Sequence, residues 1–112
     1  MKLNHLGITV TDVLAASAFL ETYFGLEPIG KKRPNLSHLQ DENGLILSLF
    51  RGTKITEPQT THIGFIRGSE AEVDELYGRL ARDGFKADPP HHSHGYTFYL
   101  VAPGGFAVEV VC

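Results

Sequence analysis

The chain has 112 residues, of which 42% are hydrophobic and 21% are charged, and its formal net charge is −3. A chain of this length forms one domain and buries about two thirds of its unfolded surface without disulfide or metal cross-links. The charge leaves no basic face for nucleic acid, and the absence of a long apolar run or a signal-peptide pattern argues against a membrane partner. A single cysteine excludes a disulfide framework and a cysteine-based zinc site, so we expect a cytoplasmic protein.

The first predicted strand lies in the segment LNHLGITV, residues 3–10. Its aliphatic residues at every second position predict one face packed against a helix, and His5 falls on the opposite face. A helix is predicted next, because Asp12 is a favourable N-cap and apolar residues follow at steps of three and four until Gly25. Beyond it, a Pro-containing stretch, a polar segment at 35–40, a turn at 41–44 and the apolar run LILSLF predict three short strands.

The second half of the chain repeats this order. HIGF at 62–65 matches HLGI at 5–8, SEAE at 69–72 has the form of a capping box, and a helix that ends at Gly84 precedes GYTFYLV and FAVEVVC. Equivalent landmarks lie 57 positions apart at the histidines (5 and 62), 59 at the helix-ending glycines (25 and 84) and 61 at the last turn glycines (44 and 105). The sequence therefore predicts an α+β fold of two βαβββ modules, residues 1–52 and 60–112, joined by a linker at 53–59.

Polar residues recur on the face of each module that is turned away from the helix. His62 has the strand phase of His5, and Glu109 lies between two valines on the corresponding face of the last strand, where its carboxylate needs a partner. Aligning the turn glycines places Ser48 at the position equivalent to Glu109. Two imidazoles and one carboxylate on neighbouring strands are typical of a site for a divalent transition metal. Two plainer interpretations stay open: surface histidines without a ligand role, and a Glu109 that pairs with a lysine or arginine.

These residues resemble the vicinal oxygen chelate superfamily, which includes glyoxalases, fosfomycin resistance proteins, bleomycin-binding proteins and extradiol dioxygenases. The resemblance lies in the paired starts HLGI and HIGF, the ending FYLVAPGGFAVEV and the tandem module plan, and it covers nearly the whole chain. It implies sheets that curl into a half-barrel cleft with helices on the outer face, and metal ligands from the first and last strands of the modules. Three residues match such ligand positions: His5, His62 and Glu109.

Some positions distinguish this chain among the members it resembles. Ser48 departs from the Glu or Gln that the glyoxalases carry, which argues against lactoylglutathione lyase activity. The fosfomycin-resistance thiol transferases use two histidines and one glutamate, as this chain does. Tyr99 matches a tyrosine that those proteins place near the drug phosphonate, and Thr97 falls where they have a serine, whereas Pro89 stands where they have a lysine.

The resemblance implies an enzyme that depends on one divalent metal ion (Fe, Mn, Ni, Zn or Co) and acts on a small-molecule substrate with adjacent oxygens. The chemistry it implies is that of a lyase, a dioxygenase or a thiol transferase. We assign catalytic roles to Glu109 as base and to Tyr99 and His94 as hydrogen-bonding or proton-transfer groups, because an unperturbed imidazole titrates near neutrality. The alternative is a binding protein of the bleomycin-resistance type, which sequesters a drug or metabolite without turnover.

The remaining predictions concern the cleft and the assembly. Four residues are candidates to line the cleft: Ser48, Phe50, His38 and Thr97. For the run of histidines at 91, 92 and 94 a solvated loop is the alternative, and for His38 the alternative is a strand that faces solvent. Apolar side chains on the ligand-bearing faces predict a homodimer. These are Ile46, Phe50, Ile66, Tyr99, Val101 and Val111.

Overall fold

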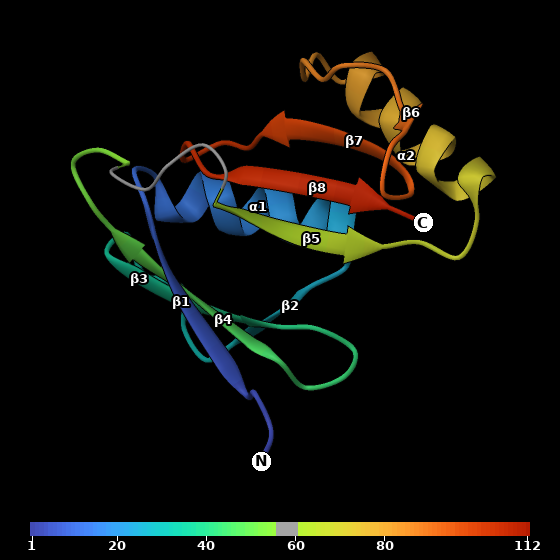
Figure 1. The fold of residues 1–112 in the computed structure, drawn as a ribbon. Helices are drawn as coiled ribbons and strands as arrows, with labels where there is room; N and C mark the ends of the chain where they lie inside the picture. The colour runs from blue at the N-terminus through green and yellow to red at the C-terminus, as the bar shows by residue number, and fades with distance from the viewer. Residues whose placement is uncertain (56–60) are drawn as a thin grey trace. The chain divides into compact units, whose positions relative to one another are not determined.

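The computed structural model describes residues 1–55 and 61–112, and most of the predicted linker at 53–59 lies outside them. The helices and strands follow the order βαβββ twice along the chain, which confirms the predicted α+β fold of tandem modules (Figure 1). The chain divides into two compact units. One consists of Met1–Thr56 with Pro103–Phe106, and the other of Glu57–Ala102 with Ala107–Cys112.

The first unit contains a four-stranded sheet in the order β1-β4-β3-β2. The edge strand β1 is parallel to β4, and the other neighbours are antiparallel. Its elements are β1 (His5–Val10), α1 (Val13–Phe24), β2 (Glu27–Ile29), β3 (Leu36–Gln40) and β4 (Ile46–Arg51).

The second unit has the same topology, with the sheet order β5-β8-β7-β6. Here β5 is parallel to β8, and β7 is antiparallel to both of its neighbours. Its elements are β5 (His62–Ile66), α2 (Glu70–Arg82), β6 (His91–His92), β7 (Tyr96–Val101) and β8 (Ala107–Val111).

The strand registers are equivalent in the two units. Ser48 pairs with Gly7 on one side and His38 on the other. Glu109 pairs in the same way with Gly64 and Tyr99. The alignment of Ser48 with Glu109 that the turn glycines predict therefore holds in the sheets.

Both helices begin at the predicted caps. Asp12 caps α1 by accepting a backbone N–H at 3.0 Å, and Gly25 ends that helix with a φ of 70°. At the start of α2, Ser69 Oγ accepts from the Glu72 N–H at 3.2 Å. The return bond of this capping box differs from the usual pattern, since Glu72 Oε2 accepts from the N–H of Gly68 at 2.6 Å.

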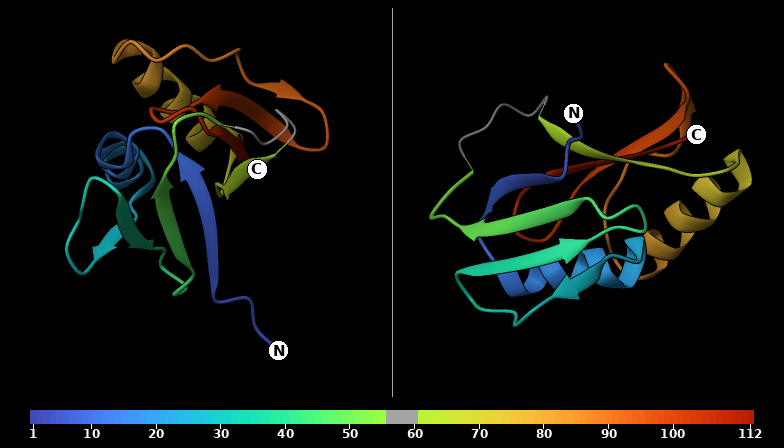
Figure 2. Two further views of the ribbon diagram at one scale, coloured as in Figure 1. Left: turned by 90° about the vertical axis from the view of Figure 1, so that its left-hand side faces the viewer. Right: turned by 90° about the horizontal axis from the view of Figure 1, so that it is seen from below.

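Each unit has a core between its helix and one face of its sheet. In the first unit, α1 packs on β3 and β4 (Figure 2). Leu6, which the strand pattern places on the core face, is 44% exposed, because β1 is the edge strand. Neither helix in the described part of the chain is both long and apolar enough to span a bilayer. The core residues include Val13, Leu20, Leu39 and Leu49 in the first unit and Val73, Leu80, Phe98 and Val110 in the second.

The turn between β7 and β8 belongs to the first unit. The carbonyl oxygen of Gly104 accepts a hydrogen bond from the Thr11 N–H at 2.9 Å, directly before α1. Gly104 has a φ of 93°, and a Cβ at this position would lie 3.2 Å from the Asp12 carbonyl oxygen and 3.3 Å from the Ala16 side chain. A glycine is therefore required by both the backbone conformation and the close approach.

The buried hydroxyl of Ser37 lowers the stability of the first unit, and this can be tested. Ser37 is 1% exposed, and its Oγ has no hydrogen-bond partner within the described residues. Because an unpaired buried hydroxyl costs about 1–3 kcal/mol, Ser37→Ala is expected to raise the free energy of unfolding by about 1 kcal/mol. Urea unfolding monitored by circular dichroism measures this change. If the dependence of the unfolding free energy on urea concentration stays the same, the substitution has changed only the stability.

The matched control is Ser17→Ala, since Ser17 is equally buried but donates to Glu21 Oε2 at 2.9 Å. The lost bond to a carboxylate is worth about 1.5–3 kcal/mol, which outweighs the gain of about 0.5 kcal/mol from the better helix propensity of alanine. This variant is expected to be less stable than the wild type. Equal effects of the two substitutions would contradict the assignment of Ser37 as unpaired.

Candidate metal centre

The carboxylate of Glu109 is the centre of the polar face of the second unit. Glu109 is 5% exposed and lies on β8 between Val108 and Val110, whose side chains point into the core. Gly64 and Tyr99 flank it in the sheet and share its face. An ionised carboxylate at this depth is costly unless neighbouring groups compensate its charge.

Imidazoles contact both oxygens of this carboxylate. His62 Nε2 lies 3.1 Å from Oε2, and His94 Nε2 is hydrogen-bonded to Oε1. Thr97 Oγ1 donates to Oε1 at 2.8 Å and also lies 2.9 Å from the carbonyl oxygen of Val110. Since a hydroxyl has a single hydrogen, Thr97 divides it between these two acceptors. The partners come from β5, β7 and the turn before β7, so the fold of the second unit alone assembles them.

These contacts set the protonation of the carboxylate. Burial alone would raise the pKa of Glu109, but hydrogen bonds from Thr97, Tyr99 and His94 and the charge of His94 hold this pKa below its ordinary value. Burial also raises the pKa of Tyr99, and its hydrogen bond to the Glu109 carboxylate raises it further. At neutral pH the site therefore contains an ionised carboxylate beside a protonated phenol.

One side of the Glu109 carboxylate is accessible from solvent through its imidazole partners. The side chain of His62 is 33% exposed and that of His94 is 55% exposed, against 7% for Glu109. Tyr99 meets His62 edge to face, with ring centroids 5.4 Å apart, and thereby limits the orientations of that imidazole. A small ligand can reach the nitrogen atoms without unfolding the sheet.

The donor set of His62 and Glu109 fits a divalent transition metal. Neutral imidazole nitrogen and carboxylate oxygen are ligands that such metals use. When two ligand atoms each bind a metal ion at about 2.1 Å and form a right angle at the metal, they lie about 3.0 Å apart. This distance is close to the separation of His62 Nε2 and Glu109 Oε2. Within residues 1–55 and 61–112, however, no three His, Cys, Asp or Glu side chains are grouped so as to hold a metal ion. The pair is thus two ligands of a candidate site and requires at least one more.

His5, the third predicted ligand, lies on β1 of the first unit. It pairs with Ile46 of β4 as His62 pairs with Ala107 of β8, so the two histidines occupy equivalent positions. The side chain is exposed, and its Nδ1 lies 2.6 Å from Asn4 Oδ1. A hydrogen bond from Nδ1–H to this amide oxygen leaves Nε2 as the free base, which is the arrangement common among metal-binding histidines.

The structure brings together two of the predicted cleft residues in the first unit. His38 Nδ1 lies 2.7 Å from Ser48 Oγ, and Ser48 is 7% exposed. The Phe50 ring covers Gly7, where a Cβ would lie only 3.1 Å from Phe50 Cε2. Sequence reasoning missed both the His38–Ser48 bond and the bond from Thr97 to Glu109. The repeat could have predicted the His38–Ser48 bond, since His38 aligns with Tyr99 and Ser48 aligns with Glu109.

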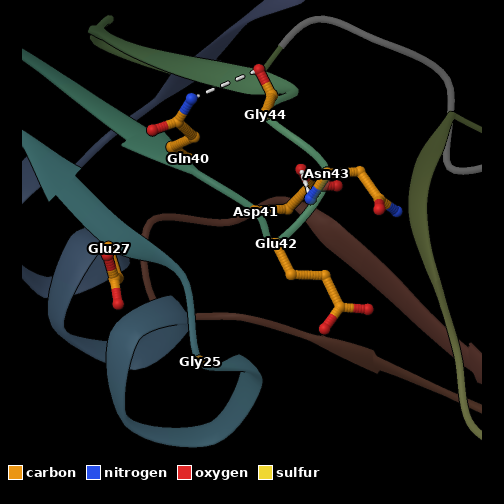
Figure 3. Close-up of a pocket in the computed structure, with 7 residues that line it drawn as sticks. All are labelled: Gly25, Glu27, Gln40, Asp41, Glu42, Asn43 and Gly44. Atoms are coloured by element: carbon orange, nitrogen blue, oxygen red, sulfur yellow. Dashed lines mark hydrogen bonds between the residues drawn. The ribbon is translucent and has the colours of Figure 1, made fainter.

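A separate pocket of the first unit is lined by residues that the sequence analysis did not assign to a functional site. It lies between the end of α1, β2 and the turn before β4 (Figure 3), and its lining residues are Gly25, Glu27, Gln40, Asp41, Glu42, Asn43 and Gly44. Asp41 Oδ1 accepts from the N–H groups of Asn43 and Leu45 at 3.0 and 2.8 Å, so this carboxylate stabilises the turn. The acidic lining disfavours anionic ligands.

Comparison with solved structures places this fold among known proteins. A possible glyoxalase from Bacillus cereus is 46% identical with a TM-score of 0.94, over 100% of this chain and 99% of that one. The fosfomycin resistance protein FosX from Listeria monocytogenes is 25% identical with a TM-score of 0.81, over 98% of this chain and 90% of that one. A variant of FosX has been solved with Mn(II) and 1S,2S-dihydroxypropylphosphonic acid.

Sequence comparison gives the family. A trivalent organoarsenical cleaving enzyme from Bacillus sp. (strain MD1) is 31% identical over 84 residues, which are 75% of this chain and 52% of that protein. The chain thus spans about half the length of this curated relative. A family model described as Glyoxalase/Bleomycin resistance protein/Dioxygenase superfamily matches residues 2–110. In agreement with the tandem modules and their equivalent registers, the chain belongs to this superfamily.

Proposed function

We propose that the chain is a metal-dependent enzyme that acts on a small molecule with adjacent oxygens. The observation that carries the proposal is the buried Glu109 carboxylate with a lowered pKa, placed between His62 and His94. In this proposal His62, Glu109 and His5 hold one divalent ion, which serves as Lewis acid and template for the oxygens of the substrate. His5 is included because it is the equivalent of His62 in the repeat.

The other polar residues around Glu109 then bind the substrate and move protons. His94, with about half of its side chain exposed, connects Oε1 of Glu109 with solvent and is the candidate proton relay. Tyr99, whose pKa is raised, stays protonated at neutral pH and donates a hydrogen bond. Thr97 holds Oε1 so that Oε2 remains turned toward His62. Glu109 itself is the candidate base.

The relatives support metal dependence but leave the reaction open among lyase, dioxygenase and thiol-transfer chemistry. Mn(II) in FosX supports manganese among the metals that suit this donor set, which also include Fe, Ni, Zn and Co. The organoarsenical cleaving enzyme is a weaker guide to the substrate. Trivalent arsenic favours soft thiol ligands, and this chain has one cysteine. We therefore do not extend the arsenical substrate to it.

A second candidate function is a binding protein that sequesters a small molecule on the same polar face without turnover. The observation in its favour is that no three candidate ligands are grouped within the described ranges 1–55 and 61–112. In that case His62 and His94 compensate the Glu109 charge and have no role as ligands. Metal binding by the purified protein distinguishes the two functions.

The metal proposal predicts the effect of removing each ligand. Mn(II) binding is expected to weaken by more than about 100-fold in each of three variants, His5→Ala, His62→Ala and Glu109→Gln. Losing a residue that only hydrogen-bonds to a ligand already lowers metal affinity by about 10- to 100-fold, and the loss of a ligand itself should have a larger effect. Calorimetric titration of metal-stripped protein measures the dissociation constant. The matched control is His91→Ala, an exposed histidine of β6 that should leave metal affinity unchanged. A wild type that binds none of Mn(II), Fe(II), Ni(II) or Zn(II) would favour the sequestering function.

Thr97 provides a test of how the carboxylate is oriented. Thr97→Val keeps the shape of this fully buried side chain but removes its bond to Glu109 Oε1. It is expected to weaken Mn(II) binding by about 10- to 100-fold, as other losses of outer-shell bonds do. Thr9→Val on β1 is the matched control, because it makes the same chemical change away from Glu109. Unchanged Mn(II) affinity in Thr97→Val would show that the bond from Thr97 does not orient the carboxylate for the metal.

We also propose that the chain forms a homodimer in solution. Ile66 and Val101 are 82% and 68% exposed, although both are large apolar residues on strands of the second unit. Sedimentation equilibrium is expected to give twice the chain mass of 12.3 kDa. Replacing both residues with glutamate should produce monomers, whereas Leu14→Glu on α1, 46% exposed, should not. A wild-type monomer would refute the proposal.

A further inference from the structure

The first unit carries a serine–histidine pair where the second unit carries a glutamate–tyrosine pair. Ser48 occupies the position of Glu109, and His38 occupies the position of Tyr99. Ser48 is 7% exposed and has Leu47 and Leu49 as its neighbours in the strand. In the described part of the chain, its hydroxyl has one hydrogen-bond partner, which is His38 Nδ1 at 2.7 Å.

The direction of this hydrogen bond follows from counting hydrogens. A buried hydroxyl that does not donate its hydrogen pays a desolvation cost of about 1–3 kcal/mol. Ser48 has no other described acceptor, so its O–H donates to Nδ1 of His38. A neutral His38 that accepts at Nδ1 carries its own proton at Nε2. Protonation adds a hydrogen at Nδ1, for which Ser48 Oγ is then the acceptor, and Nε2 keeps its hydrogen.

His38 therefore presents an Nε2–H donor in both of its protonation states. No described residue hydrogen-bonds to this nitrogen, and the residue is only half-buried. Ile29, which pairs with His38 in the sheet, and Phe50 are 37% and 48% exposed. Because strand residues alternate between faces, both lie on the same face as His38 and give the donor an apolar surround.

We propose that His38, held by Ser48, is a substrate-binding residue that recognises an oxyanion of the substrate through Nε2–H. The ligand chemistry is a carboxylate or phosphonate oxygen on a compact, partly apolar molecule. This inference rests on the proposed function, since His38 lies on the same face of the sheet as His5. It extends that function by naming the group that the substrate carries besides its metal-binding oxygens.

A serine–histidine pair can also be a catalytic nucleophile with its general base, and the geometry argues against this function for Ser48 and His38. Such a base is oriented by a third group on its other nitrogen, and His38 has none among the described residues. Covalent labelling of Ser48 by phenylmethanesulfonyl fluoride, located by mass spectrometry, would overturn the proposal in favour of a nucleophile.

The first experiment determines which ring nitrogen of His38 carries the proton. It uses long-range nitrogen–proton correlation NMR on the full chain, at a pH where imidazoles are neutral. The expected spectrum shows the proton on Nε2 in the wild type and a mixture of tautomers in Ser48→Ala. Ser37→Ala is the matched control, because it removes a buried hydroxyl from the neighbouring position without touching His38. A proton on Nδ1 in the wild type would overturn the proposal.

The second experiment titrates methylphosphonate and acetate into metal-free and Zn(II)-loaded protein and follows the ring signals of His38. The chemical shifts of the His38 ring are expected to change and to saturate as the anion is added. His38→Phe should weaken anion binding by about 10- to 100-fold, which corresponds to the loss of one hydrogen bond to a charged group. His38→Gln should recover part of the affinity by restoring an N–H donor, and His91→Gln should match the wild type. The stronger of the two ligands identifies the oxyanion class.

Equal affinity of the wild type and His38→Phe for both anions, or no shift at His38 in either form of the protein, would overturn the proposal. This outcome is distinct from failure of the proposed function. Metal affinity is measured separately on the His62 and Glu109 variants, which leave the His38–Ser48 pair intact.

Discussion

The polar face of the second unit depends on the compensation of one buried charge. Glu109 lies in a strand whose neighbouring residues are valines, and burial by itself would raise its pKa. The bonds from Thr97, Tyr99 and His94 reverse that effect and keep the carboxylate ionised. Each of these bonds favours the ionised carboxylate, so each stabilises the unit as well as orienting the carboxylate. The same bonds leave both imidazoles partly exposed, where a ligand can reach them.

The duplicated backbone carries unequal chemistry in its two halves. Equivalent positions hold Glu109 with Tyr99 in one unit and Ser48 with His38 in the other. A second carboxylate at Ser48 would add another negative charge to a chain that is already at −3. A serine satisfies its hydroxyl with a single partner and leaves a histidine nitrogen unused. The two units thus keep one architecture, while one provides a carboxylate and the other an imidazole N–H donor.

The sequence predicted the module order, the helix caps and the equivalence of Ser48 with Glu109, because these depend on local spacing, strand phase and turn glycines. It also predicted that Glu109 needs a partner, since a carboxylate between valines is costly. It did not predict which partner, because contacts across strands depend on register and side-chain rotamers. Leu6 shows the same limit: alternation gives its face, but only the sheet order reveals an edge strand that the helix leaves exposed.

The turn at Pro103–Phe106 has a consequence for how the chain is made. These residues complete the first unit, where the Gly104 carbonyl oxygen accepts from the N–H of Thr11. During synthesis at about 5–20 residues per second, the N-terminal segment leaves the ribosome well before this turn does. The first unit therefore cannot acquire all of its native contacts until residues 103–106 have also left the ribosome. Although the halves are repeats, they do not mature one after the other, and a separately expressed N-terminal half would lack part of its own unit.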